Sequence, residues 1–356
     1  MRMLALGLDN GRVMMVDEAT GEEKWSIQAH SPSSPVHVAM SPNGRFVACV
    51  GFNDNHHCWK ILFAASGELH REVATHVAPN DPDGFLMGMG LRAVAFSPCG
   101  QRLATAGDSV NGTVVLWDPR TGEADHRMQE DNGDAWTIAF TTDGARVAIS
   151  RSDVKVIDVF DATTGAWFRT IHVNDWIESM SFSPTAISIL ATAGENHEIR
   201  VWNIESGEMI REIKGCSMVA IFSPDGRTIA SASADGARDV QLMDAESGAL
   251  RSRMVGHTSF VSTASWSLDG SKLATGSGDG ASGSGDVTCK VWDSSTGALL
   301  LSIDAGRPVA SVVWGRDWVR EQGAMAFAMG HHLRLGVESQ VLALEEGVVR
   351  MILDRV

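Results

Sequence analysis

Short stretches that alternate between apolar and polar residues, each ended by turn residues, repeat along most of the chain. The clearest copy spans residues 260–297 and reads FVSTASWSLDG, then SKLATGS, then DVTCKVWDSSTG. Such alternation predicts strands with one buried face, and the Ser-Leu-Asp-Gly sequence at the end of the first stretch predicts a tight turn. The unit therefore predicts three short strands, which a more polar fourth strand follows.

Two independent turn markers give the period of this pattern. The turn after each first strand begins at residues 41, 97, 141, 183, 223 and 267, and a glycine follows the third strands at Gly21, Gly67, Gly122, Gly165, Gly207, Gly248 and Gly297. Most spacings in both series are close to 40–45 residues, which predicts radial or stacked repetition. A four-stranded sheet with apolar middle strands cannot bury both faces alone. Packing such sheets around a common axis buries them.

The two ends of the chain predict how the ring closes. Residues 1–30 supply a second, third and fourth strand but no first strand, and residues 347–353 (GVVRMIL) resemble a lone first strand. Pairing of the termini would complete one sheet and favours a self-contained ring. We therefore predict an all-β, eight-bladed β-propeller as a single domain over residues 1–356. Its predicted blades are 348–356 plus 1–30, 35–76, 91–130, 135–173, 177–215, 216–257, 260–305 and 308–346. The last of these is the least regular, and the alternative is a seven-bladed ring in which it is a decoration.

Three segments carry a resemblance to a known family. They read AFSPCG, LATAG and TVVLWDPRTG within residues 95–122, SFSPTA, LATAG and EIRVWNIESG within 181–207, and WSLDG, LATGS and CKVWDSSTG within 266–297. The chain resembles WD-repeat β-propellers over nearly its whole length. Several copies in register are strong evidence for the fold. They say little about function, because one fold hosts many unrelated tasks.

The resemblance implies a hydrogen-bonded structural tetrad in each regular blade. The blade over residues 260–305 matches it throughout, with His257, Thr275, Asp286 and Trp292. Other blades depart from the pattern, because Phe160 and Met243 stand where the family has Trp. A His, an Asp and a hydroxyl invite comparison with a catalytic triad. The recurrence of these residue types from blade to blade favours a structural role instead, and we predict no catalytic residue.

Composition narrows the choice of partners. The formal net charge is −15, which argues against direct nucleic-acid binding and against docking on anionic membranes. The five cysteines are far apart and include no CxxC pair, and the six-residue apolar run before Asp9 is shorter than a secretory signal needs. We therefore expect reduced thiols and a cytoplasmic or nuclear location. We expect no cofactor and no bound metal.

The family resemblance also implies a binding face formed by loops at one end of the ring. Two insertions fall in those loops, at residues 77–90 and 278–285. The first carries Phe85, Met87 and Met89, which either contact a partner or fold onto the rim. The second is rich in Gly and Ser, which favours a flexible linker.

Residues at the start of the first strands point to the same face in the family. This sequence has Arg92, Asp134, Trp136, Trp176, Glu178, Met218 and Phe260 there. Two Trp side chains beside carboxylates would form an aromatic, acidic mouth suited to a cationic group. The alternative is that Trp136 and Trp176 are ordinary packing between blades.

Three functional hypotheses remain from the sequence. The first is a non-catalytic scaffold that docks protein partners on this face, as a monomeric ring within a larger complex. The second is a reader of a basic or modified peptide at the mouth. The third is a propeller enzyme with a metal in the central channel. The third is disfavoured because Glu178 is the only carboxylate at the matching first-strand positions. The DNHHC sequence at residues 54–58 lacks a second ligand cluster of the kind that zinc sites need.

Overall fold

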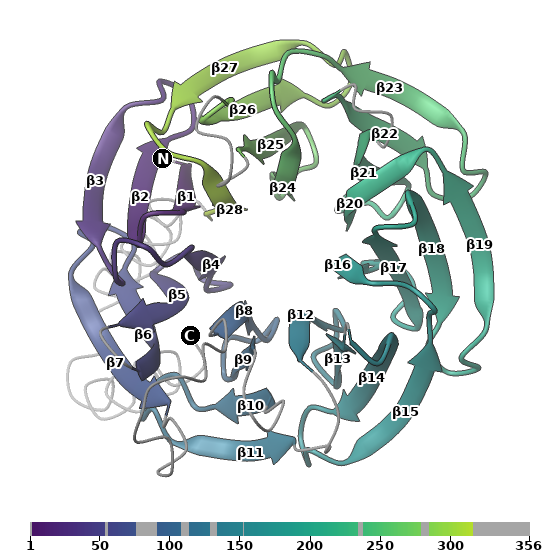
Figure 1. Ribbon diagram of the computed structural model, residues 1–356, viewed down its shortest axis with the longest axis horizontal. Coiled ribbons are helices and arrows are strands. Elements are labelled where there is room, and N and C mark those ends of the chain that lie inside the picture. The colour runs from purple at the N-terminus through teal and green to yellow at the C-terminus, as the bar shows by residue number, and fades with distance from the viewer. Residues whose placement is uncertain are drawn as a thin grey trace, which may run out of the picture.

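The protein is an all-β ring with a central channel (Figure 1). The computed structural model describes residues 2–53, 56–75, 91–107, 114–128, 134–151, 153–233, 238–278 and 285–315. These residues form 28 strands in seven four-stranded antiparallel sheets and contain no helix. Accordingly, the described ranges hold no helix that is long and apolar enough to cross a membrane.

Each blade runs from its first strand at the channel to its fourth strand at the perimeter (Figure 1). Blade 1 consists of β4 (His37–Met40), β5 (Phe46–Asn53), β6 (His56–Phe63) and β7 (Leu69–Thr75). Blade 2 consists of β8 (Leu91–Phe96), β9 (Leu103–Gly107), β10 (Val114–Trp117) and β11 (Ala124–Met128). Blade 3 consists of β12 (Ala135–Phe140), β13 (Arg146–Arg151), β14 (Val156–Asp161) and β15 (Trp167–His172). Blade 4 consists of β16 (Ile177–Phe182), β17 (Ile189–Gly194), β18 (Glu198–Asn203) and β19 (Met209–Lys214). Blade 5 consists of β20 (Cys216–Phe222), β21 (Thr228–Ser233), β22 (Val240–Asp244) and β23 (Leu250–Met254). Blade 6 consists of β24 (Val261–Trp266), β25 (Lys272–Ser277), β26 (Thr288–Asp293) and β27 (Leu299–Asp304). The composite blade consists of β28 (Val309–Trp314), β1 (Met3–Leu8), β2 (Arg12–Asp17) and β3 (Glu23–Gln28).

The prediction of eight blades is wrong, because the described residues form seven blades, the number that the alternative gave. That alternative treated residues 308–346 as a decoration, whereas residues 309–314 form a strand of the ring. The ring does close through a composite blade, but its first strand is β28, which pairs antiparallel with β1 in a register that aligns Leu6 with Val312. Residues 309–314 therefore complete the N-terminal sheet instead of starting a further blade. The strand predicted at 347–353 lies outside the described residues.

The turns between first and second strands follow directly from the sequence. In blade 6 the Gly270 N–H donates to Ser267 O at 2.9 Å, and the Ser267 hydroxyl donates to Asp269 Oδ1 at 2.7 Å. Gly270 has φ +67°, a backbone conformation that side chains disfavour and glycine adopts readily. The same pattern of Ser or Thr followed by Asp or Asn and then Gly forms the corresponding turns of blades 1, 3 and 5.

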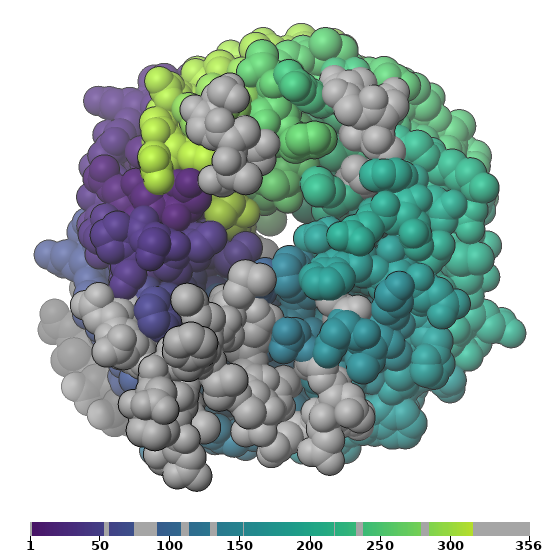
Figure 2. All heavy atoms as spheres, viewed as in Figure 1, coloured from purple at the N-terminus to yellow at the C-terminus, as the bar shows by residue number. Residues whose placement is uncertain are grey.

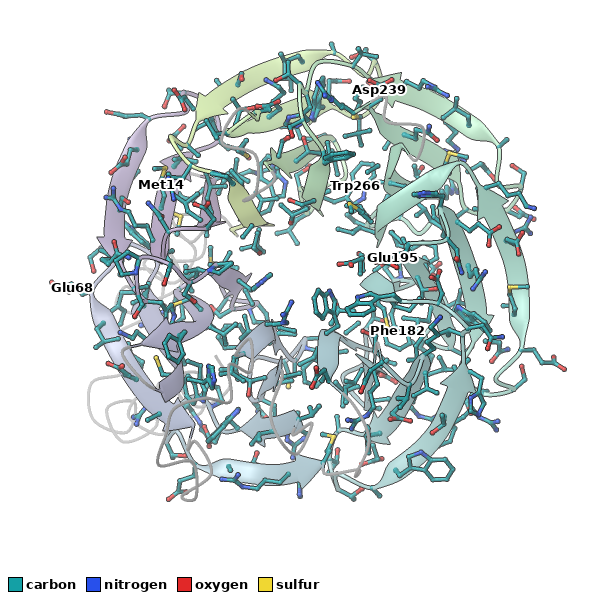
Figure 3. The ribbon with its side chains drawn as sticks, in the orientation of Figure 1. Met14, Glu68, Phe182, Glu195, Asp239 and Trp266 are labelled. Carbon is teal, nitrogen blue, oxygen red and sulfur yellow. The ribbon has the colours of Figure 1, made fainter. Side chains whose placement is uncertain are left out.

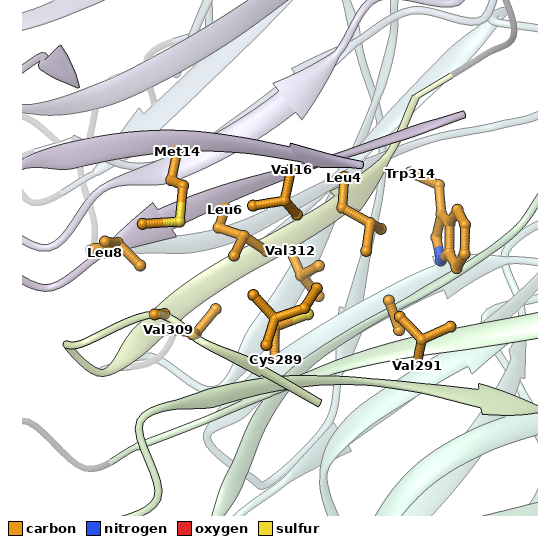
Figure 4. Close-up of a cluster of buried hydrophobic side chains, with 13 residues drawn as sticks. Leu4, Leu6, Leu8, Met14, Val16, Cys289, Val291, Val309, Val312 and Trp314 are labelled. Carbon is orange, nitrogen blue, oxygen red and sulfur yellow. The ribbon is translucent and has the colours of Figure 1, made fainter. Parts of the chain in front are cut away.

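Apolar clusters between neighbouring blades hold the ring together. One cluster joins the composite blade to blade 6 through Leu4, Leu6, Val291 and Val312, all nearly or fully buried (Figure 4). Hydrogen bonds also cross between the first strands along the inner wall. The Thr263 hydroxyl accepts from Val312 N–H at 3.2 Å. The first strands are therefore fixed to one another, and side chains that they direct into the channel have set positions.

Candidate functional site

β-Bulges at the start of the first strands of blades 2, 3 and 4 each direct one residue toward the channel. The pairing of first and second strands shifts register between Leu91 and Ala93, between Ala135 and Thr137, and between Ile177 and Ser179. The extra residues in these three bulges are Arg92, Trp136 and Glu178. A bulge leaves its extra residue outside the ladder and redirects its side chain. Three of the predicted mouth residues are therefore bulge residues on three consecutive blades.

These side chains line a cavity of about 300 Å³ at the channel. Every blade contributes to its wall, through His37, Arg92, Trp136, Glu178, Val219, Ser262 and Ala310 in ring order. The space-filling view also shows a narrow opening at the centre of the ring (Figure 2). The wall is uneven. Blades 2 to 4 contribute large or charged side chains, whereas Ser262, Ala310 and Ser311 on the opposite side are small.

Trp136 is the centre of the charged half of the wall. Its indole N–H donates to Glu178 Oε2 at 2.9 Å, and the Arg92 guanidinium carbon lies 3.8 Å from its ring centroid. The Trp176 ring meets it edge-on, at 5.1 Å between centroids and 81° between planes. Trp136 thus joins blades 2, 3 and 4, and its half-buried ring already has a cation on one face.

The ionisable groups of the mouth influence one another. Burial raises the pKa of Glu178 above its usual range, and the charge of Glu195 raises it further, whereas the Trp136 N–H and Arg92 act in the opposite sense. Burial, together with the Arg92 charge, lowers the pKa of His37 to about 4, so that its imidazole is neutral at neutral pH. Because His37 is neutral, the charge of the mouth comes from Arg92, Glu178 and Glu195.

The remaining predicted mouth residues lie around the same end of the channel. Trp176 and Phe260 directly precede β16 and β24, and Met218 lies in the irregular first half of β20. Met218 and Phe260 are 40% and 49% exposed. Asp134 is exposed, and its backbone N–H donates to Asp153 Oδ1 at 3.0 Å. The predicted loop residues Phe85, Met87 and Met89 lie outside the described residues.

Two mouth residues were missed from the sequence. His37 belongs to a first strand that starts after a Pro-rich loop, and its match to the other first strands was the available signal. Glu195 directly follows β17, and its backbone N–H donates to Trp176 O at 3.3 Å. Figure 3 places Glu195 beside the central opening. Its position depends on the close approach of β17 to residue 176, and no pattern in the sequence predicts this approach.

The tetrad residues of blade 6 are hydrogen-bonded to one another. His257 Nδ1 lies 2.8 Å from Asp286 Oδ2, and His257 Nε2 lies 2.7 Å from Thr275 Oγ1. The Trp292 indole N–H donates to Thr275 Oγ1 at 2.8 Å. The side chains of His257 and Asp286 are 0% and 3% exposed, so a substrate has no access to them. The arrangement satisfies buried polar groups, as a structural network requires.

Parts of this network recur among the described residues of other blades. The indole N–H groups of Trp117 and Trp202 donate to Thr105 and Thr192 at 2.8 and 3.0 Å. In blade 1, buried His30 faces Cys58, with Nδ1 and Sγ 3.6 Å apart. In the described part of the chain, no group of three or more His, Cys, Asp or Glu side chains is arranged to hold a metal ion.

Comparison with known proteins identifies the repeats. The family model "WD domain, G-beta repeat" matches residues 85–118, 168–203 and 207–237. The Arabidopsis thaliana transcriptional corepressor LEUNIG_HOMOLOG is 28% identical over 261 residues, which is 70% of this chain and 31% of that protein. Cell division cycle 20.1, cofactor of APC complex, from the same plant is 26% identical over 228 residues, or 59% of this chain and 47% of that protein. WD repeat-containing protein 1 of Gallus gallus is 26% identical over 239 residues, or 64% of this chain and 37% of that protein.

These similarities confirm the resemblance to WD-repeat proteins. Three segments of the chain match the WD-repeat model, and the seven sheets form a propeller. In each of the three relatives the match spans less than half of the protein's own length. Proteins built on WD-repeat propellers typically mediate protein interactions, and they are generally non-catalytic.

Proposed function

We propose that this chain is a non-catalytic docking module whose protein partners bind on the face of the ring where the first strands begin. The supporting observation is the mouth itself: bulged first strands direct side chains from neighbouring blades into one shared cavity. A rigid closed ring that presents such a set is suited to recognition, because the bound geometry exists before the partner arrives. The names of two relatives, a corepressor and a cofactor of a complex, describe proteins that act together with others.

The side chains that line the cavity do not support the hypothesis of an enzyme with a metal in the channel, because few of them are suitable metal ligands. Among the described residues that line the cavity, only His37 and Glu178 carry side chains that commonly ligate metals. They come from blades 1 and 4, with the Arg92 and Trp136 side chains on the blades between them. A catalytic metal site normally has three protein ligands and an open position. The free cysteines are consistent with the predicted cytoplasmic or nuclear location, which stays a prediction.

Affinity capture with mass spectrometry tests the docking proposal. The full chain is compared with a mouth variant, Trp176→Ala with Phe260→Ser, and with a perimeter variant, Leu250→Ser with Leu299→Ser. The perimeter residues are 46% and 47% exposed on fourth strands, so they match Phe260 in exposure but lie far from the channel. All three proteins must have the same melting temperature. We expect partners that the mouth variant loses and the perimeter variant retains. Equal recovery by all three proteins would place docking elsewhere on the ring.

A further inference from the structure

Three large apolar residues lie at or near the start of the first strands of three consecutive blades, close in sequence to residues that line the cavity. They are Trp176 of blade 4, Met218 of blade 5 and Phe260 of blade 6, here called the apolar arc. Trp176 and Phe260 hold the same register position, one residue before β16 and β24, with β20 between them (Figure 1). Met218 and Phe260 expose 40% and 49% of their surface. Clustered exposed apolar side chains mark binding surfaces more often than isolated ones do.

The backbone holds this arc in place at some energetic cost. Met218 has φ +59°, a left-handed backbone conformation that is unfavourable for a non-glycine residue. A Cβ on Gly194 would lie 1.9 Å from the backbone oxygen of Trp176, so only glycine permits this approach of β17. Backbone conformations that are strained or closely packed persist where neighbouring structure over-determines them, and they cluster at binding sites.

Negative charge adjoins the arc at blade 4. Glu195 is exposed, its backbone is bonded to Trp176, and its charge raises the pKa of both Glu178 and Asp175. No described residue forms an ion pair with Glu195. The net charge of −15 adds a long-range attraction for cationic segments. A positively charged group of a partner is therefore favoured next to the arc.

The positively charged group of the partner does not bind on the face of the Trp136 ring. The Arg92 guanidinium already lies over the ring at 3.8 Å, and Glu178 Oε2 already accepts the Trp136 N–H. An incoming cation would have to displace Arg92 from this face, whereas the carboxylate of Glu195 is open to solvent. The pairing of Trp136 and Trp176 that the sequence suggested as a cation site thus divides into two parts. Trp136 belongs to an internal network, and Trp176 belongs to the apolar arc.

We infer that the occupant of the mouth is an extended peptide segment in which a large apolar residue stands next to a lysine or arginine. The apolar side chain packs on the arc and enters the cavity of about 300 Å³, beside the small residues Ser262 and Ala310. The cation pairs with Glu195, close to Glu178. This inference rests on the proposed docking function and specifies the chemistry of the partner.

Selection from a displayed library of random linear dodecapeptides tests this inference on the full chain. We expect the enriched peptides to share a lysine or arginine within two positions of a Trp, Phe, Leu or Met. The dissociation constant of the best synthetic peptide is then measured by fluorescence polarisation. The arc variant, Met218→Asn with Phe260→Ser, should weaken binding by about tenfold or more, since buried apolar anchors dominate such interfaces. Asn tolerates the left-handed backbone at residue 218, so this change removes the side chain without adding strain.

The charge is tested separately. Glu195→Gln should weaken binding by several-fold and reduce its dependence on salt, because a screened ion pair is lost. The perimeter variant, Leu250→Ser with Leu299→Ser, should bind as the wild type does. Enriched peptides without a basic residue, equal binding by the arc variant, or no enrichment at all would each overturn the inference.

The two proposals can fail separately. If affinity capture shows partners that depend on the mouth but the selected peptides lack the paired residues, docking stands and the peptide chemistry is wrong. If captured partners are the same for wild type and mouth variant, and the selected peptides bind the arc variant normally, both proposals fail. Melting temperatures of all variants are measured first, so that unfolding cannot imitate a loss of binding.

Discussion

Single hydroxyl and carboxyl groups in this ring have effects that depend on how fully they are buried. Thr275 is 0% exposed, and its hydroxyl is bonded to both Trp292 Nε1 and His257 Nε2. Burial lowers the pKa of His257, whereas Asp286 opposes this shift. The imidazole is therefore held as a neutral group whose two nitrogens both need partners.

Removal of the Thr275 hydroxyl should be costly. Thr275→Val keeps the shape of the side chain but leaves the Trp292 N–H and a His257 nitrogen without partners in the core. We expect a loss of about 3 kcal/mol in the free energy of unfolding, measured by urea denaturation. Thr275→Ser retains the hydroxyl and is the matched control. Equal denaturation midpoints for the two variants would contradict the role of the hydroxyl.

Glu178 differs from Thr275, because we expect the native side chain to lower the stability of the folded protein at neutral pH. Its folded-state pKa lies above the ordinary 4.5, so the folded protein holds this proton more tightly than the unfolded chain does. The contribution of this group to stability is therefore lost as pH rises from about 4.5 through the folded pKa. In Glu178→Gln the amide oxygen still accepts the Trp136 N–H, but no charge has to be buried.

We expect Glu178→Gln to melt above the wild type at pH 7, with a difference that disappears by pH 4. Circular dichroism melts across this range make the measurement. Exposed Glu246→Gln is the control and should show no such trend. A lower melting temperature for Glu178→Gln at pH 7 would mean that attraction to Arg92 outweighs the cost of burial.

At the scale of the strand and the blade, polar groups in the sheet are paired across neighbouring strands. Blade 3 lacks the Trp of the tetrad and instead contains a buried ion pair, in which Arg151 Nε donates to Asp158 Oδ2 at 2.7 Å. These side chains are 1% and 2% exposed. The Thr170 hydroxyl on β15 donates to the other carboxylate oxygen at 2.5 Å. Three strands of this blade, β13, β14 and β15, are thus joined by one buried polar network.

A double-mutant cycle tests this ion pair. Arg151→Met or Asp158→Leu alone should cost about 3–5 kcal/mol, because each leaves an uncompensated buried charge. The double variant should cost much less than the sum, because well-packed apolar residues replace both charges. Unfolding free energies from urea denaturation give the coupling. Additive losses would show that the two residues act independently.

Elements were predictable wherever the signal was local. The turn glycines Gly44, Gly100, Gly144, Gly226 and Gly270 all have φ between 67° and 73°, as their place after Asp, Asn or Cys suggested. The bulges were not predictable, because the extra residue is defined by its missing partner on another strand. Arg92, Trp136 and Glu178 were named from their place at the strand start. Their contacts depend on which blades are neighbours in space.

At the scale of the whole ring, sequence pattern alone could not fix the number of blades. VVRMIL at the C-terminus and VASVVW at 309–314 have similar alternation, and both could serve as a first strand. The choice depends on which one reaches β1 in register while its side chains fill the space beside blade 6. In the structure Val309, Val312 and Trp314 do so (Figure 4). Ring closure depends on how the assembled sheets fit together, so it cannot be predicted from any short segment of the sequence.

Two shortened chains test closure by β28. A chain ended after residue 315 keeps the pairing of β28 with β1, the hydrogen bond from Gly315 N–H to Met3 O at 2.7 Å, and the bond from the Trp314 indole N–H to Ser265 O at 2.6 Å. A chain ended after residue 308 loses all three and exposes the edge of β1, with Leu4 and Leu6 uncovered. Unpaired apolar edges promote aggregation.

We expect the longer of these chains to melt cooperatively near the temperature of the full chain and to elute as a monomer. The shorter chain should lose cooperativity or associate, and circular dichroism melts with size-exclusion chromatography distinguish the two. The contrast also separates the two blade counts. If a strand at 348–356 closed the ring, both shortened chains would lack it and both would open. Equal loss of cooperative melting in the two chains would therefore contradict closure by β28. Loss in the shorter chain alone would support it.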